Sequence, residues 1–120
     1  MMRVRTQKVG GQIQREIADL LLRGEIHGVR REGVISVTGV TVSGDLQVAT
    51  VHVTAYGQPI TEGIEALKKA SGFIRGQLGK RMRMRKVPEL RFKEDTSLEY
   101  GNRIEKILVS LAIPAAGEQG

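Results

Sequence analysis

The spacing of the apolar residues alternates between helical and extended periods along this chain, and the alternation restricts the folds open to it. Over residues 4–23 the apolar positions recur every three or four residues, as on the buried face of a helix: Val9, Ile13, Ile17, Leu20 and Leu21. Residues 34–42 and 46–56 are rich in β-branched residues and flank a Ser-Gly-Asp turn. They predict a hairpin. Gly39 interrupts its first strand, and a bulge there would shift which residues face inward.

Helical spacing returns after residue 60 and continues to Met82, with the apolar positions Ile64, Leu67, Ile74 and Leu78. Ala70-Ser71-Gly72 places two weak helix formers together, which predicts a kink between two helical halves. Residues 87–93 predict a third strand, and residues 96–111 a last amphipathic helix. Residues 114–120 are small or polar and are expected to be a disordered tail.

This order of elements predicts a single α+β domain over residues 1–113. Each of the three strands has one apolar face, so the simplest solution is a three-stranded sheet that helices cover on one face. Phe73 and Phe92 are expected in the core, and Tyr56 is a candidate for exposure.

Charge and composition favour a polyanionic partner. The chain has 19 Lys and Arg against 13 Asp and Glu, a formal charge of +6. It has no cysteine, so neither a disulfide framework nor a thiolate metal site is available. No apolar stretch reaches the length that a membrane span needs, and we expect a cytoplasmic monomer.

The strongest functional signal is a basic segment between residues 72 and 88, which contains no acidic residue. Because the apolar stripe takes one helix face, the cations must spread over the exposed faces and the helix end. They predict an RNA-binding surface made of Arg75, Lys80, Arg81, Arg83, Arg85 and Lys86. Replacing Arg81, Arg83 and Arg85 by Glu is expected to weaken RNA binding and leave the fold intact.

Two alternatives concern these cations. They can simply solvate the helix and complement its C-terminal dipole. The N-terminal Arg3, Arg5 and Lys8 either extend the basic surface or only add solubility, and the sequence leaves this open.

The chain offers little material for catalysis. His27 falls in a predicted loop and His52 on a strand, so a hydrolase that uses either has weak support. Gly76-Gln77-Leu78-Gly79 spells a nucleotide-clamping G-x-x-G, but Leu78 belongs to the apolar stripe, so these are interpreted as helical glycines. No metal or nucleotide-cofactor motif is present, and we expect no cofactor.

Several segments together resemble the ribosome-binding factor A family. Ala70-Ser71-Gly72, followed by Phe73-Ile74-Arg75 and Leu78-Gly79-Lys80, is similar to the centre of the family pattern. The hairpin from Val37 to Thr54 and the segment Val87-Pro-Glu-Leu90 are similar as well, and the likeness extends from about Arg3 to Leu111.

The resemblance implies a type II KH-like domain, of order α-β-β-α-kink-α-β, in which Ala70, Ser71 and Gly72 replace the nucleotide-clamping loop. It implies a ribosome-assembly factor that binds the free 30S subunit and its 16S rRNA, acts in late 16S rRNA processing and contributes to cold adaptation. It implies no enzymatic activity. An assembly GTPase is left open as a further partner. The alternative function is a basic protein-interaction module that binds an acidic assembly partner.

Overall fold

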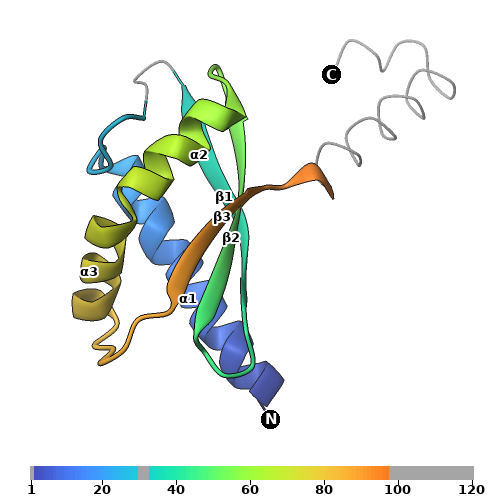
Figure 1. Cartoon of the computed structure of the whole chain (residues 1–120), viewed down its shortest axis with the longest axis vertical. Helices are drawn as coiled ribbons and strands as arrows, with labels where there is room; N and C mark the ends of the chain where they lie inside the picture. Colours follow the sequence, from blue (N-terminus) through green and yellow to red (C-terminus); the bar gives the residue numbers. More distant parts are fainter. Residues whose placement is uncertain (1, 30–32, 98–120) are drawn as a thin grey trace, which may run out of the picture.

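The computed structural model describes residues 2–29 and 33–97 of the 120-residue chain (Figure 1). Its elements are, in chain order, α1 (Met2–Leu22), β1 (Val34–Val42), β2 (Val48–Tyr56), α2 (Ile60–Lys69), α3 (Ser71–Arg81) and β3 (Glu89–Glu94). The predicted order is confirmed through the third strand. The predicted helix over residues 96–111 extends beyond the described residues, and the predicted tail lies outside them.

The three strands form one sheet in the order β1-β2-β3, with β2 in the centre. β1 pairs with β2 antiparallel, whereas β2 pairs with β3 parallel. A parallel pair needs a crossover connection, and α2 and α3 together supply it. The α+β fold with a three-stranded sheet is therefore confirmed.

A β-bulge in β1 keeps the core face of the strand continuous. The register shifts between Val37 and Gly39, so Thr38 is the extra residue. Val37 pairs with Val53 before the shift, and Val40 pairs with Val51 after it. Because side chains alternate along a strand, an inserted residue keeps both valines on the same face. The interruption noted at Gly39 therefore coincides with a bulge, whose extra residue is the preceding Thr38.

The core lies between the sheet and the helices on one of its faces. Its fully buried members come from α1, β2, α2 and α3, and they are Ile13, Ile17, Leu20, Ala49, Val51, Val53, Leu67, Ile74 and Leu78. Phe92 in β3 is buried, as expected. The core position predicted for Phe73 is wrong, because its side chain is 43% exposed.

The first helix lies against the edge strand β1. The Nε2 of Gln14 donates a hydrogen bond to the backbone oxygen of Val37, over 3.1 Å. Ile13 and Ile17 on the same helix enter the core, so a polar contact and an apolar stripe together fix its orientation.

The predicted kink lies at the junction of α2 and α3. α2 ends at Lys69 and α3 begins at Ser71, and Ala70 between them caps both helices with φ −89° and ψ 3°. Figure 1 shows the two helices meeting at an angle. Gly76 and Gly79 lie inside α3, and Leu78 between them is buried, so they are helical glycines as predicted. Among the residues that the structure describes, no helix is both long and apolar enough to cross a membrane.

Candidate nucleic-acid interface

The six cations predicted to bind RNA lie on α3 and on the connection that follows it. Arg75, Lys80 and Arg81 belong to α3. Arg83, Arg85 and Lys86 belong to residues 82–88, which we call the α3–β3 turn (lower left in Figure 1). Arg81 is partly buried, and the other five are exposed.

The α3–β3 turn begins with a tight helix end. The backbone N–H of Met82 donates to Leu78 O over 2.9 Å, and the N–H of Met84 donates to Gly79 O over 3.0 Å. Arg83 between them has φ 52°. This is the Schellman type of helix end, in which a left-handed residue lets the chain satisfy the last carbonyls. Glycine is the usual residue at that position, so arginine there carries a conformational cost of about 1 kcal/mol.

Arg75 ties the far end of the α3–β3 turn back to the helix. Its Nε donates to Pro88 O over 3.1 Å, and its Nη2 donates to Val87 O over 2.8 Å. Pro88 is itself fully buried. Since two donors of the guanidinium hold the backbone just before β3, Arg75 has a structural role that its sequence position does not suggest.

Arg81 is held by carboxylates of α1 and of the loop that follows it. Its Nη1 lies 3.0 Å from Glu16 Oε1 and 2.7 Å from Asp19 Oδ2, and its Nη2 lies 3.7 Å from Glu25 Oε2. The Arg81 side chain is only 23% exposed. These ion pairs neutralise Arg81 and fasten α3 to α1. A Glu at position 81 would add a fourth carboxylate to this cluster, so the triple replacement that includes Arg81 is now expected to disturb the fold.

The ion pairs within this cluster shift the pKa values of Asp19 and Arg81. The hydrogen bond from Arg81 holds the pKa of the Asp19 carboxyl below its ordinary value of 3.8, against the opposing effect of burial, with Arg23 adding to the lowering. The hydrogen bonds to Asp19 and Glu16 raise the pKa of Arg81.

This shift predicts how Asp19 contributes to stability at acidic pH. A carboxyl with a lowered folded-state pKa stabilises the fold fully above its unfolded pKa and loses that contribution as the pH falls through the folded one. Wild type should therefore melt at a higher temperature than Asp19→Asn at pH 7, and the difference should shrink as the pH falls below 3.8. Thermal unfolding of both proteins from pH 7 to pH 2 measures this. A difference in Tm that is the same at every pH would contradict the ion-pair explanation.

The cations that stay available form a smaller surface around the α3–β3 turn. Lys80, Arg83 and Arg85 make no ion pair within the described part of the chain. Lys86 lies near Asp45, where it adds to a lowering of the Asp45 pKa that hydrogen bonds from Ser43 and Gln47 mainly cause. We call Lys80, Arg83, Arg85 and Lys86 the basic turn surface.

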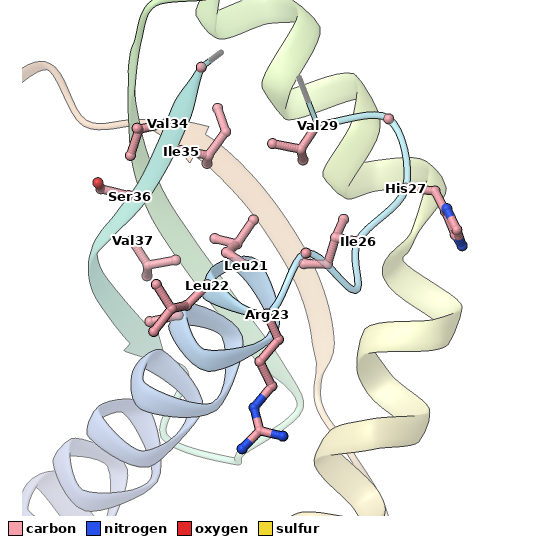
Figure 2. A pocket seen from close by; sticks show the side chains of 14 residues that line it. Leu21, Leu22, Arg23, Ile26, His27, Val29, Val34, Ile35, Ser36 and Val37 are labelled. Atoms are coloured by element: carbon pink, nitrogen blue, oxygen red, sulfur yellow. The ribbon is translucent and has the colours of Figure 1, made fainter. Parts of the chain in front are cut away.

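A cleft lies elsewhere on the described part of the chain. It occupies about 960 Å³ between the end of α1, the loop after it and β1 (Figure 2). Aliphatic side chains such as Leu21, Ile26 and Val37 line it, and Figure 2 shows the His27 ring pointing away from the strand. His52 lies on the sheet, with its Nε2 3.3 Å from Thr41 Oγ1. Within residues 2–29 and 33–97, no group of His, Asp and Glu is arranged to hold a metal ion.

Comparison with known proteins gives consistent results. The sequence profile described as "Ribosome-binding factor A" matches residues 5–108. Ribosome-binding factor A of Magnetococcus marinus is 41% identical over 118 residues, which cover 98% of this chain and 96% of that protein. The Staphylococcus carnosus protein of the same name is 42% identical over 113 residues, covering 92% and 96% respectively.

The solved structures that resemble this chain carry the same protein name as its sequence relatives. The crystal structure of ribosome-binding factor A from Thermus thermophilus superposes with a TM-score of 0.63 at 26% identity, covering 74% of this chain and 94% of that one. A homology model of the Thermus thermophilus factor, fitted into a cryo-EM map of a 30S complex, gives a TM-score of 0.61 at 25% identity, covering 72% and 91%.

Proposed function

Because this chain belongs to the ribosome-binding factor A family, we propose that it is a ribosome-binding factor that attaches to the 30S subunit through 16S rRNA. The observation that carries the proposal is the basic turn surface, where four exposed cations follow one another closely along the chain and three of them make no ion pair with a described residue. The family is not an enzymatic one, and the proposed activity is binding.

The chemistry of the basic turn surface suits a phosphate backbone. Arginine presents planar donors that pair with two phosphate oxygens at once, and each phosphate neutralised releases condensed counterions. Aromatic side chains for base stacking are scarce, since the chain has two Phe and two Tyr and Phe92 is buried. Binding should therefore depend on RNA shape and backbone position more than on base identity.

The proposed binding belongs to the assembly of the small ribosomal subunit. We propose that the factor recognises the free, cytoplasmic small subunit and assists late maturation of its 16S rRNA. The Thermus thermophilus relative was fitted into a map of a 30S complex, which supports the 30S subunit as the partner. The proposed binding unit is the single domain, in which Arg75 holds the α3–β3 turn and Arg81 fastens α3 to α1.

The test is a charge reversal of Lys80, Arg83 and Arg85 to Glu, which leaves the ion-paired Arg81 in place. Losing three phosphate contacts should weaken binding to free 30S subunits on the order of a hundredfold. The slope of log affinity against log salt should become shallower by roughly 2 to 3 units. Sedimentation with free subunits and with assembled ribosomes, at several salt concentrations, measures both effects.

The matched control reverses three exposed cations of α1, namely Arg5, Lys8 and Arg15, which changes net charge by the same amount. Equal losses in the two variants would refute the basic turn surface as the site of attachment, because net charge or a wider surface that includes Arg5 and Lys8 would then drive it. Unchanged binding of the Lys80, Arg83 and Arg85 variant would refute the assignment. Binding to subunits that excess 16S rRNA does not compete away would point to a protein partner instead.

A further inference from the structure

Two residues other than glycine adopt positive φ within the described part of the chain, and their surroundings differ. Leu46 has φ 60° and Arg83 has φ 52°. Leu46 packs against the hydrophobic core, so the contacts of its side chain offset the unfavourable backbone. Leu46 therefore has a reason within the fold to be something other than glycine.

Arg83 has no such reason. Its side chain is exposed, and within residues 2–29 and 33–97 it makes neither a hydrogen bond nor an ion pair. Its backbone occupies the position at a helix end where glycine removes the strain entirely. An unfavourable conformation that nothing in the fold compensates is typical of residues that contact a ligand.

Hydrogen bonds on both sides of Arg83 fix the position of its backbone. The Met84 N–H bond to Gly79 O holds one side of the residue, and Arg75 holds the end of the turn through Val87 O and Pro88 O. The turn is thus shaped before any partner arrives, so little conformational entropy is lost when it binds.

We infer that Arg83 is the anchoring phosphate contact of a pre-formed turn, kept as arginine against its backbone preference because its guanidinium binds an RNA phosphate. This inference rests on the proposed function. Arg75 acts through the backbone of the turn and is a positioning residue. A guanidinium suits the anchor because it meets two phosphate oxygens in a fixed geometry, which an ammonium group does not.

Three replacements of Arg83 separate the backbone from the side chain. Arg83→Ala removes the side chain and keeps the strain, whereas Arg83→Gly removes both. Arg83→Gly should melt about 4 °C above Arg83→Ala. Both should bind free 30S subunits about tenfold more weakly than wild type, with a salt slope shallower by roughly 0.7 to 0.9. Arg83→Lys should keep the wild-type salt slope and still bind several-fold more weakly.

The readouts are thermal unfolding and sedimentation with free subunits at several salt concentrations. Equal melting temperatures for Arg83→Gly and Arg83→Ala would overturn the strain argument. Wild-type affinity in Arg83→Gly would refute Arg83 as the anchoring contact. If the triple variant of Lys80, Arg83 and Arg85 still lost binding in that case, the proposed function would stand and only the role of Arg83 would fail. If wild type itself failed to bind, the proposed function would fail instead.

Discussion

Alanine at Gly10 should destabilise the protein, whereas alanine at the next residue, Gly11, should stabilise it by about 1 kcal/mol. A β-carbon on Gly10 would lie 2.7 Å from the backbone oxygen of Val40 in β1. Neither the backbone of β1 nor the packed helix α1 can move away from this contact without a loss of stability. A β-carbon on Gly11 meets only the mobile end of Arg15, at 3.8 Å. The two variants should differ in free energy of unfolding by roughly 2 to 3 kcal/mol.

Both substitutions gain the same helix propensity, so their difference isolates the contact between α1 and β1. Urea or thermal unfolding of the two variants and wild type measures it. If Gly10→Ala were as stable as Gly11→Ala, the close approach of the helix to the strand would be disproved. Retained far-ultraviolet circular dichroism in both variants would show that the comparison concerns one and the same fold.

Truncation of Ile74 should cost about 2 to 5 kcal/mol of stability, whereas truncation of its neighbour Phe73 should cost about 1 kcal/mol. Ile74 is fully buried, so Ile74→Ala leaves a cavity between α3 and the sheet. Phe73 is 43% exposed, and water already reaches much of its ring. Denaturant unfolding of the two variants gives the comparison. A larger loss for Phe73→Ala than for Ile74→Ala would contradict the orientation of α3 described above.

The contrast between Phe73 and Ile74 also shows where sequence reasoning succeeds. The apolar spacing predicts each helix and strand through residue 94, because burial on one face imposes a period that survives in the sequence. The core position predicted for Phe73 rests on its large apolar side chain, and it is wrong because Phe73 follows the break at Ala70. Only the orientation of α3 after the break decides which of two adjacent apolar residues faces the core, and that orientation depends on packing against the sheet.

The sequence predicts the charged segment of the candidate site, but not which of its cations remain available on the folded surface. Six cations in a segment without an acidic residue predict an RNA-binding surface, but the segment does not show which of them the fold itself uses. The carboxylates that neutralise Arg81 are far away in sequence, on Glu16, Asp19 and Glu25, and no local pattern reveals them. The bonds of Arg75 were hidden for another reason, since every residue has a backbone carbonyl and only the folded path shows which two are within reach.

The contact between α1 and β1 bears on how the protein behaves in concentrated solution. β1 is at the border of the sheet, and such strands can recruit a strand from another molecule and begin aggregation. Gln14 occupies the oxygen of Val37, and the α1 backbone at Gly10 crowds the oxygen of Val40. The first helix therefore blocks these two carbonyl oxygens from pairing with a strand of another molecule, and it also covers the core.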